Sequence, residues 1–90
     1  MTEFEWNKDK ARINMIKHSV SFEEASTVFD DAFAIYYEDK FHSKNEERFI
    51  VKGYSNSDRL LIVSFLFKDE IIRIISARLA TKKERKQHEK

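Results

Sequence analysis

Cysteine is absent from this 90-residue sequence, and glycine occurs only once. Without cysteine, disulfide bonds and thiolate metal sites are excluded. A single glycine excludes a glycine-rich loop that cradles phosphate. No stretch approaches the roughly 20 apolar residues of a membrane-spanning helix, and the N-terminal MTEFEWNKDK lacks the apolar segment of a secretory signal. We therefore expect a cytoplasmic protein with no membrane contact.

The composition is typical of one folded domain. Hydrophobic residues make up 41% of the chain and aromatic residues 13%, with eight phenylalanines, which argues against disorder. A chain of this length buries about 60–65% of its unfolded surface. We therefore expect a single domain over residues 1–90 with one modest core.

Charge is distributed unevenly, although the net charge is only +1. Residues 78–90 carry six Lys or Arg against two Glu, or +4, whereas the first 77 residues carry 11 against 14, or −3. A basic end on a mildly acidic body suits a polyanion, a membrane surface or an acidic protein. A helix surface that only confers solubility is an equally simple interpretation.

Hydrophobic periodicity predicts two helices, four strands and a final helix. We expect helices over about 8–17 and 21–30, strands over 33–37, 47–54, 59–67 and from 71 onward, and a helix after 81. Ser21 with Glu24, and Thr81 with Glu84, have the spacing of capping boxes. On the first helix, Ala11, Ile13, Met15, Ile16 and His18 predict a buried face. Gly53 is a candidate bulge.

Short connections between the strands favour an antiparallel meander. The sequence therefore predicts an α+β fold of order ααββββα, with a four-stranded antiparallel sheet. Both early helices should cover one face of that sheet and leave the other open.

The last strand contains two arginines, Arg73 and Arg78, among isoleucines, where an uncompensated charge is costly. An anionic ligand would account for them, and an internal ion pair is the alternative for Arg73. Their spacing of five would send them to opposite faces of a regular strand. A bulge intervenes, or Arg78 lies beyond the strand end, or only one meets the ligand. We favour Arg78 at the strand–helix junction and Arg73 on the open face beside Arg48, although Arg48 could instead pair with Glu46 or Glu47.

Motifs over almost the whole chain match one known family. They are Phe4-Glu5-Trp6-Asn7, Lys10, Asn14, Lys17-His18, Val20-Ser21-Phe22-Glu23, Ala25, Val28-Phe29-Asp30, Asp39, His42-Ser43, Glu47-Arg48-Phe49, Arg73-Ile74-Ile75-Ser76-Ala77-Arg78, Ala80-Thr81 and Glu84-Arg85. At these spacings the sequence resembles the BrnT toxins. Two positions depart from the pattern. Ser19 stands where the family usually has Gly, and Ser tolerates a left-handed turn poorly; His88 stands near a position often occupied by Tyr.

The resemblance implies a ribonuclease toxin of a type II toxin–antitoxin module, with a fold similar to the RelE toxins. It also implies neutralisation by BrnA, a ribbon-helix-helix antitoxin, whose complex with the toxin binds operator DNA and represses its own operon. Self-association of the free toxin through the open sheet face, giving a homodimer, is a further expectation.

RNA cleavage without a metal ion needs a base for the 2′-hydroxyl, cations for the crowded phosphorane and an acid for the departing 5′-oxygen. We expect Arg48, Arg73, Arg78, His42 and His18 to be the catalytic residues, with Asp39 or Glu47 as alternative bases. The expected RNA-binding residues are Lys17, Lys52, Arg59, Lys82, Lys83 and Arg85. No histidine spacing suggests a metal site, and we expect no metal and no cofactor.

Some of these residues also have a purely structural interpretation. His18 can be a structural helix terminus, and Lys82, Lys83 and Arg85 can be a solvated helix face. Two other functions also remain open. One is a non-enzymatic nucleic-acid-binding module, and the other is an interaction protein that binds a partner through its open sheet face.

Overall fold

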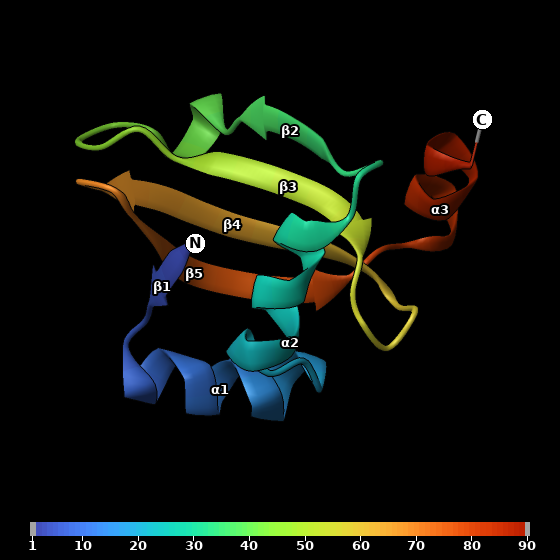
Figure 1. The fold of residues 1–90 in the computed structure, drawn as a ribbon, viewed down its shortest axis with the longest axis horizontal. Coiled ribbons are helices and arrows are strands. Elements are labelled where there is room, and N and C mark those ends of the chain that lie inside the picture. Colours follow the sequence, from blue (N-terminus) through green and yellow to red (C-terminus); the bar gives the residue numbers. More distant parts are fainter. Residues whose placement is uncertain (1, 90) are drawn as a thin grey trace.

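The computed structural model describes residues 2–89. The elements are β1 (Glu3–Glu5), α1 (Lys8–His18), α2 (Phe22–Thr27), the 3-10 turn η1 (Val28–Asp30), β2 (Ile35–Glu38), the 3-10 turn η2 (Lys40–His42), β3 (Phe49–Tyr54), β4 (Leu60–Lys68), β5 (Ile71–Leu79) and α3 (Lys82–His88) (Figure 1). The strands form one sheet in the order β1-β5-β4-β3-β2.

The α+β class is as predicted, but the sheet differs in detail from the predicted one. It has five strands and is mixed, because β1 pairs in parallel with β5, with Glu3 opposite Ile71 and Glu5 opposite Arg73. The predicted order ααββββα therefore lacks its first strand. Three residues are too few to show a period, and their partners lie at the other end of the chain, so no local pattern revealed β1.

A β-bulge interrupts the pairing of β4 with β5. Ile74 lies opposite Phe65 and Ser76 lies opposite Ser64, so Ile75 is an extra residue on β5. An extra residue shifts the alternation of side chains by one position. The bulge therefore changes which face every later residue of β5 occupies.

Arg73 and Arg78 share one face of the sheet because of this bulge. Ile72, Ile74 and Ala77 are all buried in the core, with Ile72 and Ile74 before the extra residue and Ala77 after it. The two arginines alternate with these core residues and point to the other face. Of the three alternatives that the spacing left open, the bulge is the one observed. Arg78 lies within β5 rather than at the junction with α3.

Gly53 does not mark a bulge, because β3 pairs with β4 in unbroken register through it. A Cβ at Gly53 would lie 3.0 Å from Val28 Cγ1, from Asp31 Oδ2 and from Ala34 Cβ. The glycine therefore lets the segment after α2 pack directly against β3.

One face of the sheet is covered by α2 and η1, and α1 runs along the edge of β5 (Figure 1). The main core lies between the sheet and these helical segments. Its buried members are Val20, Phe22, Ala25, Val28, Val51, Leu61, Val63, Phe65, Ile72, Ile74 and Ala77. Ala11 packs against this core as predicted, but the rest of the predicted buried face of α1 is wrong. Ile13, Met15 and Ile16 are exposed by 45%, 47% and 72%, whereas Asn14 is the buried residue of this helix.

The helix caps agree with those predicted from the sequence except at α2, where one half of the predicted capping box is missing. Ser19 adopts φ 56° and ψ 34°, the left-handed conformation that the usual glycine would favour. Thr81 and Glu84 form the predicted capping box. At α2, Ser21 accepts the predicted bond from the Glu24 amide, but the Glu24 carboxylate turns away to Arg59. In the described part of the chain, no helix is long and apolar enough to cross a membrane.

Candidate active site

A cleft of about 300 Å³ opens on the sheet face opposite α2. Its lining includes four of the five predicted catalytic residues, His18, His42, Arg48 and Arg78, together with Asp39. They come from the end of α1, from η2 and the residue before it, from the residue before β3 and from the end of β5, so the fold brings together residues up to 60 positions apart in the sequence.

Arg78 is held by the N-terminus of α3. Its Nη1 and Nη2 donate to Glu84 Oε1 at 2.8 Å and Oε2 at 3.0 Å, and Nη1 also donates to the Leu79 carbonyl at 3.2 Å. The hydrogen bond from Arg78 is the main reason why the pKa of Glu84 falls from its ordinary value of 4.5 to about 2. The same bond raises the pKa of Arg78. The pair is therefore charged at any physiological pH.

Arg48 is placed by the turn that carries His42. The Arg48 carbonyl accepts from the Asp39 amide at 2.8 Å, and the Arg48 amide donates to Ser43 Oγ at 2.9 Å. The Arg48 guanidinium has only a loose partner, because Nε and Nη2 both lie 3.3 Å from the same oxygen of the exposed Glu46. The Arg48–Glu46 pair that the sequence suggested is present, and a phosphate can displace so weak a partner.

His42 and Asp39 form a dyad on η2. The distance from His42 Nδ1 to Asp39 Oδ2 is 2.8 Å, with the carboxylate 11% exposed and the imidazole 68% exposed. A carboxylate accepts, so in the neutral ring Nδ1 carries the hydrogen and the lone pair is on Nε2. The contact with Asp39 therefore fixes the orientation of the ring and directs Nε2 away from the carboxylate. His18 reaches the same cleft from the end of α1.

Arg73 lies in an adjoining cleft of about 560 Å³, which it shares with Arg48, Lys10 and Lys68. Its Nη1 donates to Glu5 across the β1–β5 pair, which is the internal ion pair considered as an alternative. Arg48 lines both clefts. The two clefts therefore form neighbouring parts of one surface, and Arg73 lies to one side of the His42–Arg78 cleft.

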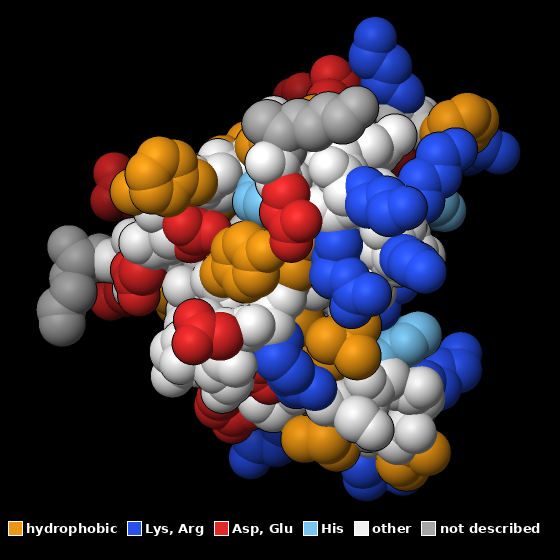
Figure 2. Space-filling model, turned by 90° about the vertical axis from the view of Figure 1, so that its right-hand side faces the viewer, with side chains coloured by type: hydrophobic (Ala, Val, Ile, Leu, Met, Phe, Trp, Pro, Cys, Tyr) orange, Lys and Arg blue, Asp and Glu red, His pale blue; other side chains and the backbone are white. Residues whose placement is uncertain are grey.

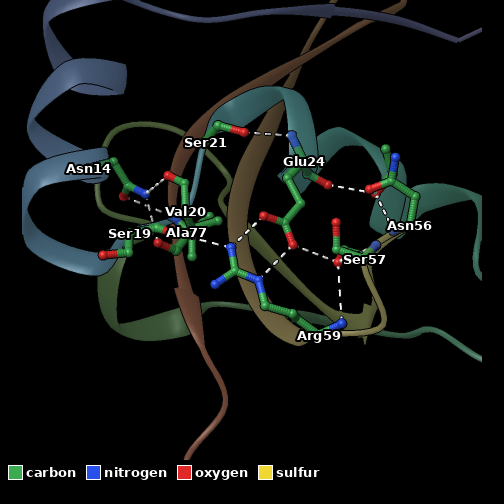
Figure 3. Close-up of polar contacts among 11 residues, drawn as sticks. Asn14, Ser19, Val20, Ser21, Glu24, Asn56, Ser57, Arg59 and Ala77 are labelled. Carbon is green, nitrogen blue, oxygen red and sulfur yellow. Dashed lines mark hydrogen bonds and ion pairs between the residues drawn. The ribbon is translucent and has the colours of Figure 1, made fainter.

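Arg59 lies elsewhere, against α2 (Figure 3). Its Nε donates to Glu24 Oε2 at 2.9 Å, and its Nη2 donates to Glu24 Oε1 and, at 3.0 Å, to the Ser19 carbonyl. The Glu24 carboxylate also accepts from Ser55 Oγ. These bonds tie α2 to the start of β4 and to the end of α1, so we leave Arg59 out of the proposed RNA surface.

The other predicted RNA-binding residues are solvent-facing. Lys52 is on the cleft side of β3, because it pairs with Ile62, whose partner on β5 is Arg78. Lys17 on α1 and Lys82, Lys83 and Arg85 on α3 are exposed. Within residues 2–89 none of these five side chains forms an ion pair.

Tyr37 is a cleft-side residue that the sequence did not single out. It pairs with Ile50 on β3, and Ile50 lines the cleft. Burial raises the pKa of Tyr37, and the charge of Glu84 raises it further, which places the phenol near the Arg78–Glu84 pair. Two tyrosines stand side by side in β2, so alternation alone could not show which of them faces the cleft.

Charge is segregated on the face of the molecule that is seen from the α3 end. Figure 2, a view from the α3 end, shows Lys and Arg side chains gathered on one side of the molecule and most Asp and Glu side chains on the other. Among the described residues there is no group of three or more His, Cys, Asp or Glu that could hold a metal ion.

One cleft thus brings together two guanidinium groups and an imidazole that a carboxylate orients. Such a set of groups can hold a phosphodiester and transfer a proton beside it. A model of the family described as the ribonuclease toxin BrnT of type II toxin–antitoxin systems matches residues 6–84. The chain belongs to this BrnT family.

A solved structure shares this fold. The chain is similar to the crystal structure of the Brucella abortus ribonuclease toxin BrnT, with a TM-score of 0.71 and 20% identity over 91% of this chain and 100% of that one. A search of curated proteins gives no match.

Proposed function

We propose that the chain cleaves RNA without a metal ion, in the cleft between η2 and the end of β5. The observation that carries the proposal is the convergence of Arg48, Arg78 and the Asp39-oriented His42 on that cleft. The two arginines hold the scissile phosphate and stabilise the negative charge that grows on it, since a planar guanidinium binds two phosphate oxygens and stays charged.

The chemistry follows from the free nitrogen of His42. Its Nε2 takes the proton of the ribose 2′-hydroxyl, and the 2′-oxygen then attacks phosphorus. The Asp39 carboxylate stabilises the imidazolium that forms. The bond from phosphorus to the 5′-oxygen breaks, and His18 is the proposed donor of a proton to that oxygen. The products are a 2′,3′-cyclic phosphate and a 5′-hydroxyl end.

The remaining basic residues guide the RNA strand. Arg73 and Lys10 line the adjoining cleft, where they can contact a neighbouring phosphate. Lys17, Lys52 and the exposed cations of α3 attract the RNA backbone electrostatically, and salt weakens this attraction. These unpaired cations also favour a second candidate function, a module that binds nucleic acid without cutting it. Turnover of an RNA substrate distinguishes the two.

Growth and cleavage assays test the proposal together. Expression without an antitoxin should arrest growth, and the purified chain should cut RNA in the presence of EDTA. Arg48→Ala and Arg78→Ala should relieve the arrest at equal protein level. A wild-type chain that is harmless and leaves RNA intact in EDTA overturns the proposal.

We also propose that the neutralising partner is a ribbon-helix-helix antitoxin of the BrnA type, and that its complex with this chain binds operator DNA. Membership of a type II toxin family supports a protein antitoxin. Co-expression with a ribbon-helix-helix protein encoded next to the toxin should restore growth, and the purified complex should retard an operator fragment that the toxin alone does not retard.

The free toxin is proposed to self-associate through the open sheet face. Because that face carries the cleft, RNA should compete with self-association. Sedimentation velocity at high micromolar concentration tests this, and a monomer throughout that range contradicts it.

A further inference from the structure

Within residues 2–89, four arginines are paired with carboxylates, yet the pairs leave different donors free. An arginine has five N–H donors in a rigid fork, and a phosphate is bound in bidentate fashion by two parallel donors on one edge of that fork. One such edge runs between Nη1 and Nη2 at the tip of the group. The other runs between Nε and Nη2 along its side.

In Arg59 the side edge is occupied. Glu24 accepts from both Nε and Nη2, and the second Nη2 hydrogen goes to the Ser19 carbonyl. Nothing is left on that edge for a ligand. The arrangement is that of a structural ion pair (Figure 3).

In Arg78 the occupied edge is the tip. Glu84 accepts from Nη1 and Nη2, and the second Nη1 hydrogen goes to the Leu79 carbonyl. Three of the five donors are used. The two that remain, Nε–H and the second Nη2–H, are parallel and form the side edge, and no atom of residues 2–89 accepts from Nε. The guanidinium itself lines the cleft.

Glu84 is held as firmly as the arginine that it binds. Its Oε1 also accepts from the Thr81 amide at 2.7 Å, and its own amide donates to Thr81 Oγ1 at 3.2 Å. The carboxylate is therefore fixed by the first turn of α3, and it fixes the orientation of the guanidinium in turn.

We propose that Glu84 is a positioning residue for RNA cleavage, which grips the tip of Arg78 and presents the free side edge to the scissile phosphate. The proposal rests on the proposed ribonuclease function and assigns to α3 a part in it. The helix is then a support for a catalytic side chain as well as a carrier of positive charge. Loss of the grip lets the guanidinium rotate, and misorientation lowers the rate of the chemical step more than the affinity for RNA.

Glu84→Gln separates this role from helix capping. Glutamine is accepted at the third position of a capping box, so α3 keeps its N-terminal bonds. It has one acceptor oxygen and no charge, so the two-oxygen grip on Arg78 is lost. Glu89→Gln is the matched control, because it makes the same change of charge at the C-cap of the same helix, away from Arg78.

The experiment measures single-turnover RNA cleavage in EDTA for the wild type, Glu84→Gln, Glu89→Gln, Arg78→Ala and the double variant Arg78→Ala/Glu84→Gln, with circular dichroism to confirm folding. We expect Glu84→Gln to lower the maximal rate about tenfold or more with less than a twofold change in the half-saturating RNA concentration. Glu89→Gln should match the wild type, and the double variant should be no slower than Arg78→Ala alone.

The outcomes distinguish this inference from the function on which it rests. If the wild type cuts RNA and Arg78→Ala does not, but Glu84→Gln matches the wild type, the positioning role is wrong and the nuclease proposal stands. The positioning role also fails if Glu84→Gln slows the Arg78→Ala background as much as it slows the wild type. If the wild type cuts no RNA, the proposed function itself fails.

Discussion

The side chain of Asn14 forms hydrogen bonds with both backbone groups of Ala77, as a neighbouring strand would. Its Nδ2 donates to the Ala77 carbonyl at 2.8 Å, and its Oδ1 accepts from the Ala77 amide at 3.1 Å (Figure 3). The same Nδ2 donates to the Val20 carbonyl at 2.9 Å. Ala77 lies just after the bulge and just before Arg78, on a part of β5 that β1 does not reach. One buried amide therefore closes the sheet edge next to the proposed active site.

Asn14→Ala should destabilise the protein by about 3 kcal/mol, because it leaves buried backbone groups of Ala77 and Val20 without partners. The urea midpoint of unfolding measures the change. Arg12→Ala, at an exposed position of the same helix, is the control and should stay within about 0.5 kcal/mol of the wild type. Equal midpoints for the two variants would contradict the role of Asn14.

Arg59→Ala should lower stability without lowering the cleavage rate of the folded protein. The substitution removes the bonds to Glu24 and to the Ser19 carbonyl, and we expect a loss of about 1–2 kcal/mol. Thermal unfolding measures the first effect, and RNA cleavage well below the unfolding temperature measures the second. A large drop in cleavage by a folded Arg59→Ala variant would mean that Arg59 does belong to the RNA-binding surface.

The Arg78–Glu84 pair should make stability depend on pH in the acid range. The pKa of Glu84 is about 2 in the folded protein and 4.5 ordinarily, so its contribution is complete above pH 4.5 and is lost as the pH falls toward 2. Glu84→Gln should be less stable than the wild type by about 1 kcal/mol at pH 7, since the pair is partly exposed. The difference in urea midpoint should shrink between pH 4.5 and 2. A constant difference over that range would exclude a specific contribution from the charged pair.

The α3 cations should act on RNA affinity and its salt dependence. The triple variant Lys82→Gln/Lys83→Gln/Arg85→Gln should bind RNA more weakly and flatten the plot of log affinity against log salt by up to about 2, given about 0.7 per phosphate contact on a single strand. Its maximal cleavage rate should change little. Fluorescence anisotropy with a fully 2′-deoxy oligonucleotide measures binding without turnover, and an unchanged slope would mean that these side chains are only a solvated surface.

Local signals in the sequence gave much of the fold. The capping residues Ser21 and Thr81 both cap helices where their spacing placed them. Alternation and turn residues gave four of the five strands. These features depend on neighbours in the chain, so a sequence contains them directly.

Features set by distant pairing were not predictable. Ile13, Met15 and Ile16 are as apolar as core residues, and only the position of α1 at a sheet edge leaves them exposed. The bulge at Ile75 depends on the register between two strands, so the spacing of Arg73 and Arg78 left their faces open until the pairing was known. The partner of Arg59 is likewise tertiary, because Glu24 lies 35 positions away in the sequence.

The most direct test of the account is the chemistry of the cut ends, measured in EDTA under single-turnover conditions on wild type, Arg78→Ala and His42→Ala. We predict a 2′,3′-cyclic phosphate and a 5′-hydroxyl from the wild type, with rates lowered by about 10²–10⁴ in His42→Ala and by a comparable factor in Arg78→Ala. Cleavage that leaves other ends, or that proceeds at the wild-type rate in both variants, would contradict the assignment of this cleft as the active site.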